Sequence, residues 1–217
     1  MRFARPQRLV WCTAILTAIT AASGCAVIHQ MMNGDGPMMP AMFDGLEGKR
    51  VAVVCMMNSS SYGAESTAAD IAMRTSSALR RNVEEIEVVR YEDVADWIDN
   101  NNWDESDYVE VGNGVKSDLV IAFEIDSFSL HDGPTLYKGQ AYYTIKVYDV
   151  KNGGELVFDY TQPDYAFPQS HGIPSTDKKE SEFRRLFVEQ LAMDMSRTFY
   201  SYRMVEDFAK DAAAYAH

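Results

Sequence analysis

Residues 49–56 form an almost unbroken apolar run after two basic residues, Lys49-Arg-Val-Ala-Val-Val-Cys-Met56. A strand with one face in solvent alternates between apolar and polar residues. A continuous apolar run of this length is instead typical of a strand that is covered on both faces. The run therefore predicts an interior strand at the start of a folded domain.

The patterns that follow predict a helix, a short strand and a second helix, and then three long strands and a final helix. The helix at 64–82 has small or apolar residues at three- to four-residue spacing, whereas its arginines lie off that stripe. The expected ranges are strands at 86–90, 118–130, 137–149 and 155–161 and helices at 64–82, 92–99 and 177–205. Alternation followed by a meander predicts an α+β fold, a single mixed β-sheet with packed helices.

Three local details of this prediction can be checked. The apolar residues of 118–130 change face between Ile125 and Phe128, which a β-bulge near Asp126 or Ser127 would explain. Asn152-Gly-Gly154 indicates a tight hairpin turn. Asp177 and Glu180 have the spacing of residues that cap a helix. We also expect a loop at 162–174 and a mostly irregular segment at 100–117 with one helical turn near Tyr108.

The first 24 residues have the pattern of a secretory signal. Three arginines at positions 2, 5 and 8 precede an apolar run, Leu9 to Ala22, and small residues lead to Cys25. The sequence Ala22-Ser-Gly-Cys25 resembles the site at which bacteria attach lipid to a lipoprotein, although this family usually has leucine where Ala22 stands. An ordinary secretory signal and an uncleaved anchor are the alternatives. Ala26, in place of an aspartate, favours the outer membrane over the inner membrane.

This interpretation divides the chain into three parts: a lipoprotein signal peptide (1–24), a lipidated flexible tether (25–47) and an α+β globular domain (48–217). Removal of the signal removes three arginines and no acidic residue, so the net charge changes from −12 to −15. Nucleic acids select basic surfaces, so we expect no nucleic-acid partner. Cys55 is then the one free thiol. We expect it to be a small buried hydrophobe rather than a nucleophile or an intermolecular crosslink.

The order of the elements resembles that of a group of periplasmic lipoprotein domains. The segments that carry the resemblance are Lys49 to Val54, Ser117-Asp-Leu-Val-Ile121 and the turn Tyr148 to Gly153. The group comprises the curli-secretion lipoprotein, the activator lipoprotein of penicillin-binding proteins and the amino-terminal domain of the Tol-system propeller protein. The resemblance implies a protein-binding module that performs no chemistry, and it carries over no catalytic residue.

The residues themselves give little support for an enzyme. His29, His131, His171 and His217 are scattered, without the spacing of a zinc site. Ser59 to Ser61 have no identifiable base that would activate a nucleophile. Glu124 and Asp126 would share a strand face if no bulge intervened, but a solvated face is the simpler interpretation. We therefore expect no enzyme, no catalytic residue, no cofactor and no metal bound by the domain.

Two features leave alternatives open. The tether contains five methionines near His29, and thioethers select Cu(I), so a metal-handling lipoprotein is the alternative function. These methionines are Met31, Met32, Met38, Met39 and Met42. The aromatic residues on and after 137–149 could form a partner surface or belong to the core, and we favour the core. They are Tyr142, Tyr148, Tyr160, Tyr165 and Phe167.

The sequence therefore predicts a lipid-anchored periplasmic protein that acts as a non-enzymatic scaffold, adaptor or regulator of an envelope assembly. Lipid on Cys25 would hold it in a membrane of the cell envelope, with the outer membrane facing the periplasm favoured. The expected partners are this membrane and an envelope protein.

Overall fold

A computed structural model describes residues 37–57, 64–103 and 107–203. A six-stranded mixed β-sheet forms its centre, with β2 lying between β3 and β4 and parallel to both. β4, β5 and β6 then form an antiparallel meander, and short β7 pairs with the first residues of β5. The strands are β2 (Arg50–Met57), β3 (Glu87–Val88), β4 (Leu119–His131), β5 (Leu136–Asp149), β6 (Glu155–Phe167) and β7 (Ile173–Pro174).

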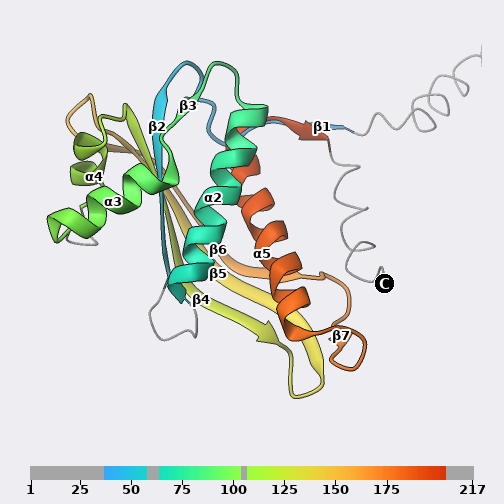
Figure 1. Ribbon diagram of the computed structural model, residues 1–217. Helices are drawn as coiled ribbons and strands as arrows, with labels where there is room; N and C mark the ends of the chain where they lie inside the picture. The colour runs from blue at the N-terminus through green and yellow to red at the C-terminus, as the bar shows by residue number, and fades with distance from the viewer. Residues whose placement is uncertain (1–36, 58–63, 104–106, 204–217) are drawn as a thin grey trace, which may run out of the picture.

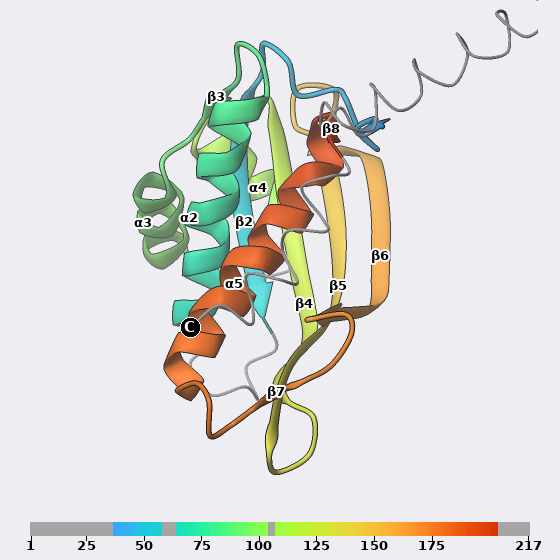
Figure 2. The same ribbon diagram turned by 90° about the vertical axis from the view of Figure 1, so that its right-hand side faces the viewer.

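Helices cover both faces of this sheet, as Figures 1 and 2 show. Helices α2 and α5 lie side by side on one face, and α3 and α4 lie on the other. Their bounds are α2 (Ala64–Asn82), α3 (Tyr91–Asn101), α4 (Tyr108–Gly114) and α5 (Glu180–Ser196). The predicted α+β fold, with one mixed sheet and packed helices, is confirmed.

The apolar run in β2 serves two cores because successive side chains of a strand point to opposite faces. Val51 and Val53 belong to the larger core beneath α2 and α5. Ala52 and Val54 belong to a smaller core beneath α3 and α4. The same alternation places Ala141, Tyr143, Ile145 and Val147 of β5 in the larger core, as predicted.

The predicted bulge in β4 is present. The register between β4 and β5 shifts between Ile125 and Ser127, so the apolar residues Phe128 and Leu130 return to the face that Ile125 occupies. The predicted hairpin turn also forms. Asn152 donates its backbone N–H to Asp149, and Gly153 and Gly154 adopt positive φ angles of 86° and 80°.

The sequence prediction was wrong at three places in the second half of the domain. β6 continues through Pro163 to Phe167 instead of ending at 161. It lies at the edge of the sheet, where a proline removes no bond to a further strand, and its register shifts at this point. The last helix ends at Ser196 and tightens into a 3-10 turn, η1 (Arg197–Phe199). Its N-cap is Lys179, without a side-chain cap, so Asp177 does not cap it.

The segment predicted as the end of a flexible tether is instead part of the packed domain. Strand β1 (Met38–Met39) pairs antiparallel with β8 (Tyr202–Arg203). The backbone N–H groups of Met42 and Phe43 both donate to the carbonyl of Thr198. Leu46 is fully buried in the larger core. The part of 25–47 that could act as a tether therefore ends before Met38, because β1 pairs with β8 and Phe43 packs on the rings of Phe158 and Phe199.

Candidate functional site

Several residues that the sequence singled out lie outside the described residues. These are the predicted lipidation site Cys25, the histidines His29 and His217, the methionines Met31 and Met32, and Ser59 to Ser61. The lipidation of Cys25 thus stays a prediction. The other candidate residues can be placed.

The two carboxylates of β4 do not form a catalytic pair. The bulge separates Glu124 from Asp126, and Asp126 is exposed. Glu124 instead accepts a hydrogen bond of 2.7 Å from Nζ of Lys146 on β5. Nothing in this ion pair points to acid–base chemistry.

Cys55 lies on the core side of β2. The residue keeps part of its surface accessible, but its thiol is surrounded by protein, and burial raises the thiol pKa to about 12. The thiolate is the reactive form, so a raised pKa suppresses nucleophilic chemistry. The structure fits a packing role for Cys55.

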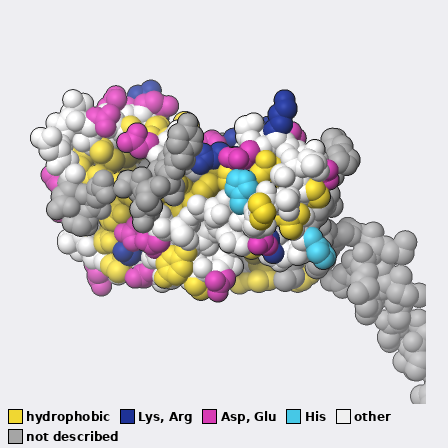
Figure 3. Space-filling model, turned by 90° about the horizontal axis from the view of Figure 1, so that it is seen from below, with side chains coloured by type: hydrophobic (Ala, Val, Ile, Leu, Met, Phe, Trp, Pro, Cys, Tyr) yellow, Lys and Arg dark blue, Asp and Glu magenta, His cyan; other side chains and the backbone are white. Residues whose placement is uncertain are grey.

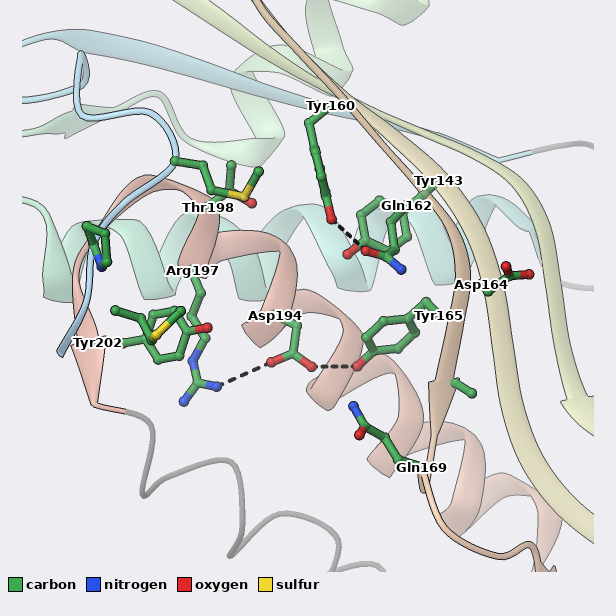
Figure 4. A pocket seen from close by; sticks show the side chains of 14 residues that line it. Tyr143, Tyr160, Gln162, Asp164, Tyr165, Gln169, Asp194, Arg197, Thr198 and Tyr202 are labelled. Atoms are coloured by element: carbon green, nitrogen blue, oxygen red, sulfur yellow. Dashed lines mark hydrogen bonds and ion pairs between the residues drawn. The ribbon is translucent and has the colours of Figure 1, made fainter. Parts of the chain in front are cut away.

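The structure brings together a group of side chains whose proximity the sequence did not predict. A cavity of about 650 Å³ lies between β6, the C-terminal end of α5 and the segment from β1 to Met42 (Figure 4). A volume of this size is in the range of small-molecule sites. We call it the edge pocket. Its lining side chains are Met39, Pro40, Met42, Tyr143, Tyr160, Gln162, Asp164, Tyr165, Ala166, Gln169, Asp194, Arg197, Thr198 and Tyr202.

Asp194 of α5 forms the polar centre of the edge pocket. Its Oδ2 accepts a hydrogen bond of 2.7 Å from the hydroxyl of Tyr165 and one of 2.8 Å from the amide of Gln190. Burial raises the pKa of Asp194 above its ordinary value, although these bonds and Arg197 oppose the shift. Burial also raises the pKa of the Tyr165 phenol, and the charge of Asp194 adds to that effect. Tyr165 thus stays protonated and acts as a donor.

Arg197 closes one side of the pocket. Its Nη1 lies 3.4 Å from Oδ1 of Asp194, and its guanidinium lies 4.4 Å from the centre of the Tyr202 ring. Only 5 % of its side chain is exposed. Tyr202 belongs to β8, which pairs with β1. The cation–π contact therefore connects η1, at the end of α5, to the strand pair where the described chain begins and ends.

The opposite wall comes from the inner face of the sheet. The hydroxyl of Tyr160 donates a hydrogen bond of 2.6 Å to Oε1 of Gln162 on the same strand. Tyr143 lies beside Gln162 in Figure 4, and its ring meets Tyr165 edge-on with 5.9 Å between the ring centres. Asp164 is exposed, and Figure 4 shows it turned away from Asp194. The pocket interior therefore has one acidic and one basic group, which offset each other.

Part of this site was among the aromatic residues that the sequence analysis singled out. Tyr160 and Tyr165 were among the aromatics assigned either to a partner surface or to the core, and both are half-buried in the pocket wall. Of the others, Phe167 is in the core, Tyr148 stacks on Tyr108, and Tyr142 is 38 % exposed. Asp194 and Arg197 were missed. Both lie in a largely buried stretch at the end of α5, and charged residues are uncommon in such stretches.

The structure tests the metal hypothesis only in part. Met39 and Met42 line the edge pocket, while Met38 precedes Met39 in a strand and so points to the opposite side. Within residues 37–57, 64–103 and 107–203, no cluster of three or more His, Cys, Asp or Glu side chains could hold a metal ion. Cu(I) binding by the whole methionine-rich segment stays a prediction.

The fold and the pocket define an α+β domain with a polar, tyrosine-rich cavity at its sheet edge. No family model and no curated protein matches the sequence. A PelC dodecamer from Paraburkholderia phytofirmans is 14% identical to the chain and covers 73% of it and 91% of its own length, with a TM-score of 0.40. Lipoprotein GNA1162 from Neisseria meningitidis is 10% identical and covers 68% and 97%, with a TM-score of 0.45. The LpoB C-terminal domain from Salmonella enterica is 13% identical and covers 58% and 88%, with a TM-score of 0.36.

Similarity at these identities and TM-scores carries no conclusion about what this chain binds. None of the described helices combines the length and apolar character needed to cross a membrane.

Proposed function

We propose that this chain is a lipid-anchored protein of the bacterial cell envelope that binds an envelope protein and acts as a non-enzymatic scaffold, adaptor or regulator. The signal-like residues 1–24 and the lipobox-like Ala22-Ser-Gly-Cys25 support the anchor. A net charge of −12 supports a well-solvated domain that does not bind nucleic acid.

One structural observation carries the proposal: the described chain begins and ends at the same end of the domain. β1 leads back towards Cys25, and it pairs with β8 at the upper right of Figure 1. The hairpin between β4 and β5 lies at the opposite end, together with β7 and the start of α5. A lipid on Cys25 would thus hold the β1–β8 end near the membrane and leave the hairpin end directed away from it.

The packed position of β1 limits how far the domain can extend from the membrane. Residues 26–37 separate Cys25 from Met38. Twelve fully extended residues span at most about 40 Å. The domain is therefore held closer to the bilayer than a tether reaching to residue 47 would allow, and a partner would meet it within this distance.

The end directed away from the anchor has a mixed surface. Figure 3 shows this end from below, with hydrophobic side chains exposed among acidic ones and with histidine side chains on the same face. His131 and Asp132 lie there at the hairpin tip, where Nε2 of His131 is 3.6 Å from Glu180. Such a mixture is typical of transient protein interfaces.

Site-specific photocrosslinking in cells tests the proposal. A photoreactive residue at Asp132 or at exposed Tyr142 should give one recurrent adduct with an envelope protein. The same residue at exposed Glu47, just before β2 and at the end of the sheet opposite the hairpin, should not. The Cys25→Ser chain should lose membrane association and most of the adduct, and Cys12→Ser should change neither. Adducts at Glu47 alone would contradict the orientation. No recurrent adduct from any of these positions would contradict the adaptor function.

A further inference from the structure

The edge pocket has the features of a small-molecule site that the adaptor function does not use. It has about 650 Å³ of space, and its walls come from three parts of the fold: β5 and β6, the end of α5 with β8, and the segment from Met39 to Met42. Because strands and a helix hold these walls, the cavity is preformed rather than made by loops alone.

Charge restricts what the pocket can hold. Asp194 already accepts hydrogen bonds from Tyr165 and Gln190 and lies beside Arg197. Arg197 in turn stacks on Tyr202. A cationic ligand would face Arg197, and an anionic ligand would face Asp194. Either ligand would lose hydration on binding, and the opposite charge that could compensate it is already paired within the pocket. The interior therefore favours a neutral ligand.

The remaining groups favour a ligand with several hydroxyls. Tyrosine hydroxyls and glutamine amides both donate and accept hydrogen bonds, and the pocket contains Tyr143, Tyr160, Gln162 and Gln169. A hydroxyl on a ligand also does both, so it can pair with either partner. The tyrosine rings add flat apolar surfaces against which the C–H faces of a sugar ring can pack. A purely apolar ligand would displace water from these polar groups without replacing its hydrogen bonds, which is costly.

We propose that the edge pocket binds a neutral saccharide unit. Tyr160 and Gln162 bond its hydroxyls from the sheet side, and the tyrosine rings hold its apolar face. Because Met39 and Met42 form the third wall, the bound sugar also contacts the segment that leads back to Cys25. The inference depends on the pocket and not on the proposed protein partner, so either can fail without the other.

The test is calorimetric titration of the full mature protein in a detergent that has no sugar headgroup. The probes are three neutral disaccharides, N,N′-diacetylchitobiose, cellobiose and maltose, with spermidine and glucose 6-phosphate as charged comparisons. At least one neutral disaccharide should bind with a Kd of about 1 mM or tighter. Saturable binding of spermidine or glucose 6-phosphate in place of the neutral sugars would overturn the proposal, as would no saturable binding of any disaccharide.

Variants assign the binding to the pocket. The double variant Tyr160→Phe, Gln162→Leu removes two hydrogen-bonding groups and should weaken binding roughly tenfold or more. Tyr142→Phe is the matched control, because it removes the same hydroxyl from β5 on the opposite face of the sheet and should leave the Kd unchanged. If the double variant unfolds, Gln162→Leu alone replaces it. Unchanged affinity in a folded pocket variant would contradict the assignment.

Discussion

The hydroxyl of Tyr165 donates a hydrogen bond of 2.7 Å to Oδ2 of Asp194 and so ties the edge strand β6 to helix α5. Asp194 also accepts from Gln190 one helical turn away, which fixes its carboxylate in place. Edge strands have one neighbouring strand rather than two, so side-chain bonds to a helix matter more for their position. This pair both shapes the edge pocket and holds its outer wall.

The buried position of Asp194 predicts a pH-dependent stability. Burial raises the folded-state pKa of this carboxyl above its ordinary value of 3.8, so the folded protein holds that proton more tightly than the unfolded chain does. The resulting stabilisation is present at low pH and is lost as the pH rises through the folded pKa. The free energy of unfolding of the wild type minus that of Asp194→Asn should therefore fall as the pH increases from about 3.5 to 7.

Urea unfolding at a series of pH values measures this difference. The Asp126→Asn variant, at an exposed position on β4, is the control for removing a carboxylate elsewhere. A wild-type advantage over Asp194→Asn that grows with pH would show that the carboxylate is stabilised in the folded state, contrary to this account.

A glycine in β5 should be required for packing rather than for its backbone conformation. A Cβ atom placed on Gly139 would lie 2.2 Å from the ring of Phe187 on α5. Gly139→Ala should therefore lower the free energy of unfolding by about 1–3 kcal/mol through overpacking. Gly153 should be required for its backbone conformation instead. Nothing lies near the position of a Cβ atom on Gly153, but its φ is 86°. Gly153→Ala should cost about 1–2 kcal/mol through strain.

Combination with Phe187→Leu separates the two causes. The smaller side chain should offset part of the cost of Gly139→Ala and none of the cost of Gly153→Ala, as measured by denaturant unfolding of single and double variants. If the changes in unfolding free energy of Gly139→Ala and Phe187→Leu were strictly additive, the contact between a new Cβ and the Phe187 ring would not be the cause of the destabilisation.

The segment before β2 should contribute to stability. Leu46 is fully buried, so Leu46→Ala should lower the free energy of unfolding by about 2–5 kcal/mol. Met42 is 55 % exposed, and Met42→Ala should change stability by no more than about 0.5 kcal/mol. Thermal unfolding of both variants measures the contrast. Equal melting temperatures would mean that residues before 48 behave as the flexible tether that the sequence suggested.

Cys55 should be unreactive in the folded protein. With a thiol pKa of about 12, the thiolate fraction at pH 8 is roughly a thousandfold lower than for an ordinary cysteine. In a Cys12→Ser, Cys25→Ser chain, alkylation by iodoacetamide should be correspondingly slow when folded and fast in urea. Similar rates in both states would show that the thiol is accessible and ionises normally.

Periodicity predicted the parts of the fold whose residues alternate or repeat clearly. The apolar run of β2, the shift of face at Ile125 and the turn at Asn152 each correspond to an observed feature. The prediction failed where tertiary context overrides a local signal. Pro163 suggested a loop, yet an edge strand accepts it at a shift in register. Leu46 looked like part of a linker, because its burial depends on elements distant in the sequence.

The edge pocket could be predicted only in fragments. Tyr143 was expected inside, and Tyr160 and Tyr165 were noted as aromatics, but Asp194 and Arg197 are far from them in the sequence. Their meeting depends on α5 packing across β4 and β5, with Tyr165 of β6 reaching Asp194, and no local pattern encodes this packing. The helix was also expected to continue to 205, and that would have carried Tyr202 away from the pocket.

Mass spectrometry of the N-terminal peptide from membrane-extracted protein tests the central claim most directly. The account predicts a chain that begins at Cys25, with a diacylglyceryl group on the sulfur and an acyl group on the amine. Peptides from residues 1–24 in the membrane-bound protein, or a chain that begins with an unmodified Cys25, would contradict it.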